Sequence, residues 1–536
     1  MSAFDYRRRT SSVARIGNVE VGGNNPVKIQ SMTSTSTMDT EASVTQCAAI
    51  ADAGADIVRL TAQGTREARN MGVIKSTLRQ RGYSIPLVAD IHFNPRAAFA
   101  AAEEVEKIRI NPGNFADPGR TFVKLNYTDE EYASEVDRIR DAFVPLLKVC
   151  KEHSTALRIG VNHGSLSDRI MSRYGDTPEG MAESAMEYLR ICRDEDFTDV
   201  VISIKASNTV VMVETVRRLV AAMDAEGMAF PLHLGVTEAG DGEDGRIKSA
   251  LGIGALLADG IGDTIRVSLS EDPVNEVPVA QSIVDYISTF ADAEPINGET
   301  YPGFNPIRPE KRHTEAIGNI GGDNRPVAIG IDFAEDDLKN FEGVEVVTGD
   351  APNASGKALA SLHKLETDRP GTPAIVKFSY PDASYDTVSV KAAIDFGRVL
   401  LAGFADGIWL DTPALTPEER ARISLSILQA ARCRMSKTEY IACPGCGRTL
   451  FDLRGTLAAV RQATSHLSHL KIGIMGCIVN GPGEMADADY GYVGASAGHI
   501  SLYKGKQCVE KNIPQKDAID HLIALIKENG DWTDPQ

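Results

Sequence analysis

The chain has 536 residues, of which 43% are hydrophobic and 24% are charged, an ordinary globular composition that excludes disorder. One hydrophobic core stops growing near ~250–300 residues, so two or three domains are expected. The formal net charge of -18 at pH 7 argues against nucleic acid and anionic membrane as main partners, because both require a positive face.

Two further features narrow the class of protein. No apolar run reaches the ~18–20 residues that span a bilayer, and residues 1–15 lack the apolar stretch of a secretory signal, so a cytoplasmic location is predicted. Eight cysteines spread unevenly over a chain of this length do not form a disulfide framework. Three of them, Cys443, Cys446 and Cys477, cluster near the end of the sequence.

Between residues 27 and 270, short apolar runs alternate with helix-like segments rich in Ala, Glu, Arg and Leu. Their number and order predict a closed parallel (β/α)8 barrel, a TIM barrel of the α/β class. A doubly wound open sheet is the alternative, but no Gly-x-Gly-x-x-Gly follows the first run. The expected strands are Val27–Met32, Ile57–Thr61, Pro86–His92, Lys107–Asn111, Leu157–Asn162, Val200–Lys205, Pro231–Val236 and Asp263–Ser268.

The pattern changes after the eighth run. The stretch 292–312 is rich in Pro, Gly, Asn and charge, as a linker would be. We expect a TIM barrel over residues 1–288, an α/β insert without a cluster of catalytic residue types over 289–432, and an α+β module over 433–536. The strands expected in the insert are Val327–Ile331, Val344–Val347, Ala374–Phe378 and Gly407–Leu410.

Several expected barrel strands carry a charge at or near their C-terminal ends, the face where barrels of this kind place their sites. One interpretation is structural pairing with neighbouring carboxylates. However, the cations outnumber Asp90 and Glu238, and a buried charge is costly without a partner, so a phosphate-like or diphosphate-like ligand is favoured. The cations are Arg59, Arg109, Arg158, Lys205 and Arg266, and the same strand ends add Asp90, His92, Asn111, Asn162, His233, Glu238 and Ser268.

The three clustered cysteines predict a metal centre. Cys443 and Cys446 form a Cys-x-x-Cys on a tight turn, and Cys477 lies in a Gly-rich, Pro-containing loop that could cradle an iron–sulfur cluster with backbone amides. A zinc site of three cysteines and one histidine and a thioredoxin-like redox pair are the alternatives. The histidines available for the zinc site are His466, His469 and His499.

Long motifs in the first and third modules resemble those of the hydroxymethylbutenyl diphosphate synthase family, the penultimate enzymes of the methylerythritol phosphate pathway. The stretch between them resembles the insert of the three-domain form found in plants and some bacteria, although it is shorter than the plant insert. The resemblance covers Gly22–Thr33, Asp90–Phe93, Arg109–Asn114, Arg158–Leu166, Leu234–Gly240, Cys443–Leu453 and Ile474–Tyr490.

The resemblance implies an oxidoreductase of isoprenoid biosynthesis that opens methylerythritol cyclodiphosphate by two-electron reduction, expels water and gives hydroxymethylbutenyl diphosphate. Electrons would come singly from reduced ferredoxin or flavodoxin. It also implies a C-terminal [4Fe-4S] module that resembles the modules of sulfite and nitrite reductases. A homodimer is a further expectation, with the module closing over its own barrel or over that of a partner.

The resemblance also assigns roles to individual residues. The implied cluster ligands are Cys443, Cys446, Cys477 and Glu484. The implied diphosphate-binding residues are Arg59, His92, Arg109, Arg158, Lys205, Arg266 and Ser268. Asp90, Asn162, Glu238 and Asn480 would lie near the reacting carbons, and Glu484 would also take part in catalysis.

Alternative functions and an alternative role for Glu484 stay open at this point. One is a phosphate- or pterin-binding barrel synthase with a structural zinc. Another is a non-enzymatic cluster carrier, which would have no use for a cationic barrel mouth. Without the resemblance, Glu484 would be interpreted as a cap of the helix-like turn that follows it.

Overall fold

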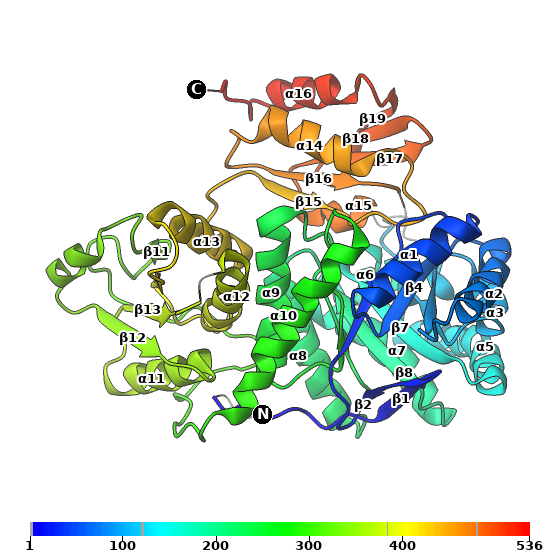
Figure 1. The fold of residues 1–536 in the computed structure, drawn as a ribbon, viewed down its shortest axis with the longest axis horizontal. Helices are drawn as coiled ribbons and strands as arrows, with labels where there is room; N and C mark the ends of the chain where they lie inside the picture. The colour runs from blue at the N-terminus through cyan, green and yellow to red at the C-terminus, as the bar shows by residue number, and fades with distance from the viewer. Residues whose placement is uncertain (1–3, 119–122, 383, 479–480, 536) are drawn as a thin grey trace.

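The computed structural model describes residues 4–118, 123–382, 384–478 and 481–535, and gives only the backbone of residues 482, 484 and 486. A two-stranded hairpin is followed by sheets of 8, 4 and 5 strands. In Figure 1 the barrel lies in the lower centre and right, the insert lies beside it on the left, and the C-terminal sheet lies above the barrel.

The eight-stranded sheet is a closed parallel barrel. Its strands pair in the order β8-β7-β6-β5-β4-β3-β10-β9, and a parallel bridge between Ile202 and Leu232 joins the two ends. The predicted TIM barrel is therefore confirmed, and each of the eight predicted runs forms a strand. The strands are β3 (Lys28–Met32), β4 (Ile57–Ala62), β5 (Leu87–Ile91), β6 (Lys107–Ile110), β7 (Ala156–Asn162), β8 (Val200–Lys205), β9 (His233–Leu234) and β10 (Thr264–Ile265).

Helices connect the strands on the outside of the barrel. Most begin with a side-chain cap, as in the capping box of Thr128 and Glu131 that starts the longest of them. Among the described residues, no helix is long and apolar enough to cross a membrane. The helices are α1 (Thr40–Asp52), α2 (Thr65–Gln80), α3 (Pro95–Ala102), α4 (Pro112–Phe115), α5 (Asp129–His153), α6 (Asp168–Tyr174), α7 (Pro178–Asp194), α8 (Thr209–Ala225), α9 (Gly242–Ala258) and α10 (Glu276–Ser288).

An N-terminal hairpin closes the bottom of the barrel. Gly17, at φ +58°, turns the chain between Ala14 and Val21 so that two strands pair antiparallel. Apolar side chains of the hairpin pack against Ile57 and Val88 at the N-terminal ends of the barrel strands. The opposite, C-terminal mouth is left for a binding site. The hairpin strands are β1 (Val13–Ile16) and β2 (Val19–Gly22).

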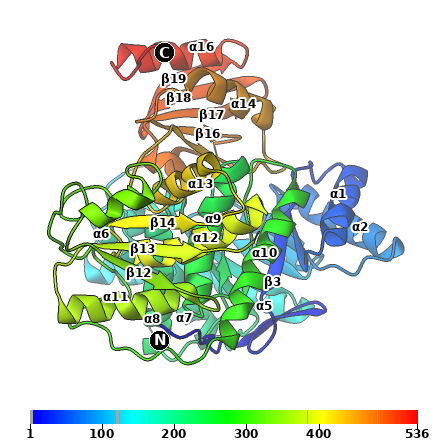
Figure 2. The same cartoon turned by 60° about the vertical axis from the view of Figure 1, so that its left-hand side comes forward.

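The insert is a four-stranded parallel sheet that packs on the barrel through α9 (Figure 2). The four predicted strands all form. Asp395 accepts hydrogen bonds from Tyr380 of the insert, at 2.9 Å, and from Tyr286 of the barrel, which ties the two parts together. The elements, paired in the order β11-β14-β13-β12, are β11 (Val327–Ala328), β12 (Glu345–Gly349), α11 (Ala354–Asp368), β13 (Ala374–Ser379), α12 (Tyr385–Leu401), β14 (Gly407–Asp411) and α13 (Pro417–Ala430).

The C-terminal module is a mixed sheet with helices, which agrees with the predicted α+β class. Its first three strands run parallel and its last two antiparallel. Its likeness to sulfite and nitrite reductase modules stays a prediction. The elements are β15 (Glu439–Ala442), α14 (Leu453–Thr464), β16 (Lys471–Met475), α15 (Gly481–Glu484), β17 (Tyr490–Ser496), β18 (His499–Lys504), β19 (Gln507–Pro514) and α16 (Ala518–Glu528).

Candidate active site

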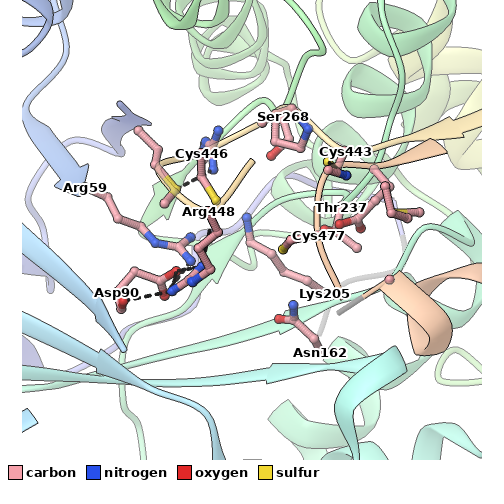
Figure 3. Close-up of a pocket in the computed structure, with 18 of the residues that line it drawn as sticks. Arg59, Asp90, Asn162, Lys205, Thr237, Ser268, Cys443, Cys446, Arg448 and Cys477 are labelled. Atoms are coloured by element: carbon pink, nitrogen blue, oxygen red, sulfur yellow. Dashed lines mark hydrogen bonds and ion pairs between the residues drawn. The ribbon is translucent and has the colours of Figure 1, made fainter. Parts of the chain in front are cut away.

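A cavity lies between the C-terminal mouth of the barrel and the loops that follow β15 and β16. Figure 3 shows three cysteines facing the same space as Lys205, Asn162 and Arg448. In this structure both walls belong to one chain. The polar and sulfur-bearing residues of the walls are Met32, Arg59, Asp90, Arg109, Arg158, Asn162, Lys205, Thr237, Glu238, Arg266, Ser268, Cys443, Cys446, Arg448, Met475 and Cys477.

The cavity gathers most of the residues that the sequence singled out. His92, Asn111 and His233 are buried but do not line it. Asn480 and the side chain of Glu484 lie outside the described residues. Their predicted roles therefore stay predictions.

Asp90 is the centre of a guanidinium hub formed by Asp90, Arg59, Arg109 and Arg448. Its Oδ1 atom lies 2.6 Å from Arg59 and 3.0 Å from Arg109, and its Oδ2 atom lies 3.1 Å from Arg448. Burial acts to raise the pKa of the Asp90 carboxyl, but the three guanidiniums hold that pKa well below its usual range. Asp90 is therefore an ionised acceptor that orients cations.

Contacts with several neighbours fix the guanidinium group of Arg109. It donates to the carbonyl of Gly160 at 2.8 Å and to Oδ1 of Asn162 at 3.1 Å, and it contacts Nε2 of His92. A side chain at Gly160 would collide with the Arg109 guanidinium, so this strand position needs glycine. Burial and the adjacent arginine hold the pKa of His92 well below its usual range, which keeps the ring neutral.

Arg266 has a carboxylate partner that sequence reasoning missed. Glu276, the first residue of α10, accepts from Nε and Nη2 of Arg266 at 3.0 and 2.9 Å. A glutamate that opens a helix is normally interpreted as compensating the helix dipole, so only the fold reveals that this one points inward. Arg448 was likewise missed as a site residue, although it stands two positions after Cys446 in the quoted motif.

Among the described residues that line the cavity, Arg158 and Lys205 are the cations without an ion pair. Within the described residues, Nε and Nη1 of Arg158 have no hydrogen-bond partner, although the residue is only 1% exposed. Lys205, 5% exposed, lies against Gly235 at the cavity wall. Burial lowers the pKa of both side chains well below the usual range. The neighbouring Arg59 adds to this effect at Arg158, and Arg266 adds to it at Lys205. A bound anion would relieve this unfavourable burial of charge.

Glu238 lies where the cationic wall meets the cysteines. It is buried, and its φ of +48° is in the left-handed region that non-glycine residues rarely adopt, a form of backbone strain that clusters at functional sites. The next residue, Ala239, forms a parallel bridge with Ala442 at the end of β15. The backbone thus directs Glu238 toward the loop that starts at Cys443.

The three cysteines form the facing wall. Gly476 donates its backbone N–H to Sγ of Cys443 at 3.2 Å, and burial raises the pKa of that thiol, which a bound cation would reverse. In the described part of the chain, no three His, Cys, Asp or Glu side chains converge on one ion position.

The histidines of the alternative zinc site are elsewhere. His466 packs edge-to-face against Trp532, with ring centroids 4.9 Å apart. His469 contacts the carbonyl of Asp531, and His499 contacts the carbonyl of Ala497. None of the three lines the cavity.

Charged and backbone contacts hold the C-terminal module on the barrel. Lys248 of α9 lies 2.8 Å from Glu439, and together with Arg432 it lowers the pKa of that carboxyl to about 2 against the opposing effect of burial. Ser270 donates to the carbonyl of Cys443 at 2.9 Å. A side chain at Gly483 in α15 would collide with the backbone of the barrel, so the two parts approach closely there.

Fold and cavity together define an α/β-barrel enzyme whose cationic mouth is capped by a cysteine-bearing module. Two family descriptions match the chain, the GcpE TIM-barrel domain over residues 10–281 and the GcpE protein C-terminal domain over residues 439–528. The chain belongs to this family, the 4-hydroxy-3-methylbut-2-en-1-yl diphosphate synthases. The predicted family and the predicted enzyme class, an oxidoreductase, are confirmed.

Curated relatives match over nearly the whole length. The 4-hydroxy-3-methylbut-2-en-1-yl diphosphate synthase (flavodoxin) of Parabacteroides distasonis is 53% identical, with 99% of this chain and 100% of the relative covered. The synthase of the same name from Chlorobaculum tepidum is 40% identical, with 99% and 90% covered. Among solved structures, an N-acetylneuraminic acid synthetase from Leptospira borgpetersenii is 13% identical, covers 55% of this chain and 94% of its own, and has a TM-score of 0.36, too distant to bear on function.

Proposed function

We propose that the chain opens 2-C-methyl-D-erythritol 2,4-cyclodiphosphate by two-electron reduction and releases water to give (E)-4-hydroxy-3-methylbut-2-enyl diphosphate. One observation carries this proposal: Arg158 and Lys205, which are buried and have no ion pair among the described residues, face the same cavity as three cysteines. A diphosphate would supply the missing charge, and the cysteines would hold the electron-transferring group beside it.

The barrel wall would bind the diphosphate. Arginine presents a planar fork that suits phosphate oxygens, and each charge-assisted hydrogen bond contributes about 1.5–3 kcal/mol. His92 would act on the diphosphate through Arg109, which it contacts. The residues proposed to contact the diphosphate are Arg59, Arg109, Arg158, Lys205, Arg266 and Ser268.

The C-terminal module would hold a [4Fe-4S] cluster through Cys443, Cys446, Cys477 and Glu484. The donor set fits, because thiolates are the usual ligands of such clusters and a backbone N–H already points at one sulfur. The bound cluster would supply electrons one at a time at the substrate. Reduced flavodoxin is the proposed donor, since the relatives carry that word in their names, and ferredoxin is the alternative.

The carboxylates would have different tasks. Both oxygens of Asp90 are engaged by guanidiniums, so it would orient them. Glu238, between the two walls, would hold the proton that the departing hydroxyl takes up, and Asn162 would hold the substrate beside Arg109. Asn480 is proposed near the reacting carbons on the family resemblance alone.

The modular boundaries are also proposed. Helix α10 ends at Ser288 and α13 ends at Ala430, so boundaries after residues 288 and 432 separate barrel, insert and C-terminal module. The cavity is complete within one chain, and activity would not require a second copy. A cytoplasmic location is proposed because a small soluble reductant must reach the enzyme.

Anaerobic turnover tests the function. Protein purified without oxygen, given the cyclodiphosphate and dithionite, should form hydroxymethylbutenyl diphosphate, detected by phosphorus NMR and mass spectrometry. The Cys477→Ser variant should lose both the visible absorbance of the cluster and the product. Unchanged substrate in a preparation that holds about four irons per chain, as one such cluster requires, would contradict the proposal.

A further inference from the structure

Arg448 reaches from the C-terminal module into the mouth of the barrel. Its Nη1 and Nη2 atoms each lie 3.1 Å from Oδ2 of Asp90, and Nη2 also donates to the Asp90 carbonyl at 3.0 Å. The residue is 8% exposed. Nη1 also lies 3.9 Å from Sγ of Cys446, so one guanidinium contacts both the barrel and a proposed cluster ligand.

The loop that carries Arg448 lies directly on the barrel. Gln63 donates to the carbonyl of Gly447 at 3.2 Å. A side chain at Gly447 would approach the carbonyl of Thr35 to 2.9 Å, which shows how closely the loop and the barrel pack. A fixed contact at Arg448 therefore sets where Cys446 stands relative to the cationic wall.

The single carboxylate of Asp90 forms ion pairs with both modules. Its Oδ1 pairs with Arg59 and Arg109 of the barrel, and its Oδ2 pairs with Arg448 of the C-terminal module. One carboxylate cannot fully compensate three buried guanidiniums. In the absence of an anion, the barrel arginines and Arg448 therefore compete for Asp90.

We propose that Arg448 is a positioning residue that couples closure of the C-terminal module to occupancy of the anion site. An anion that binds Arg59 and Arg109 compensates their positive charge. Asp90 then interacts mainly with Arg448, which strengthens the contact between the modules. Because coupling is reciprocal, loss of this contact weakens anion binding by the same factor. The inference rests on the proposed function only for the identity of the anion.

Hydrogen exchange of the anaerobic holoenzyme tests the contact without substrate. In Arg448→Gln, peptides within 441–452 and 86–94 should exchange at least about tenfold faster than in the wild type, because charge-assisted hydrogen bonds to Asp90 are lost. Arg448→Lys keeps the charge but cannot form the paired hydrogen bonds of a guanidinium, so its exchange rates should lie between those of the wild type and of Arg448→Gln. Arg454→Gln is the matched control, since Arg454 also crosses to the barrel, at 2.6 Å from the Glu271 carbonyl, but is exposed and outside the cavity.

Anion addition tests the coupling. Inorganic pyrophosphate and the cyclodiphosphate should each slow exchange in these peptides of the wild type and of Arg454→Gln, but not of Arg448→Gln, which should bind the cyclodiphosphate about tenfold more weakly. Wild-type exchange rates and full protection in both Arg448 variants would overturn the proposal. Protection of the wild type by pyrophosphate but not by the cyclodiphosphate would support the coupling and contradict the proposed substrate.

Discussion

Glu276 accepts two parallel hydrogen bonds from Arg266, and the two side chains are only 2% and 4% exposed. The carboxylate also accepts from Ser31 at 2.7 Å and from the backbone N–H of Leu269 at 3.2 Å. Its hydrogen bonds are thus satisfied before any ligand arrives. Arg266 is held in place toward the cavity, and neither partner can be removed alone without leaving a buried charge.

Arg266→Met should therefore destabilise the protein strongly, by about 3–5 kcal/mol, because Glu276 is left charged and unpaired. The free energy of unfolding from urea titration of the substrate-free protein measures the effect. The double variant Arg266→Met/Glu276→Gln should recover most of the loss. If the double variant is as unstable as the single one, the unpaired charge of Glu276 is not the cause of the lost stability.

Arg158→Met should have the opposite effect on stability. Arg158 has buried nitrogens without partners among the described residues, so a side chain of similar length without charge should raise the free energy of unfolding of the substrate-free protein. Affinity for the cyclodiphosphate should fall by one to two decades, at ~1.4 kcal/mol per decade. A variant that is less stable and binds normally would show that Arg158 has a structural role instead.

Mixing two inactive chains tests closure within one chain. The cavity takes its cations and its cysteines from the same chain, so Arg109→Ala mixed with Cys477→Ser should show no more activity than the two separate variants. Mixing should include co-refolding or co-expression so that chains can exchange. Strong recovery of turnover would mean that the module closes over the barrel of a partner.

The insert should lose stability in acid through His363. The ring is 1% exposed, accepts from the backbone N–H of Tyr301 at 3.1 Å and packs on Phe404, and burial lowers its pKa to about 4. Because the folded pKa lies below the ordinary 6.5, the stability from the neutral ring is present above pH 6.5 and is lost as the pH falls toward 4.

The loss should approach about 3 kcal/mol at most. Urea unfolding followed by Trp409 fluorescence in a Trp532→Phe background reports on the insert, because Trp409 lies in β14. His363→Gln, which cannot titrate, should flatten the pH dependence between 6.5 and 4. An equally steep profile in that variant would assign the acid sensitivity to other groups.

Much of the fold could be predicted because strand periodicity and turn residues are local properties. All eight barrel strands and four insert strands follow from apolar runs bounded by Gly, Pro or Asn. The hairpin at Gly17 was missed, although Gly17-Asn18 between two short apolar runs is a two-residue hairpin signal.

The site could be predicted only in part, because partners distant in sequence are set by the fold. Charges at strand ends pointed to the cavity through the geometry of barrels. The pairing of Arg266 with Glu276, and the reach of Arg448 to Asp90 across two modules, have no local signature. The position of His92 beside Arg109, rather than on the cavity wall, likewise depends on side-chain packing.

The central claim is that the cationic wall and the cysteines form one site. Electron paramagnetic resonance of the reduced holoenzyme during titration with the cyclodiphosphate tests it most directly, with binding measured in parallel by calorimetry. We predict a saturable change in the cluster signal whose midpoint follows the calorimetric affinity and moves at least about tenfold higher in Arg158→Met. Saturable binding of the cyclodiphosphate with an unchanged cluster signal would contradict the account.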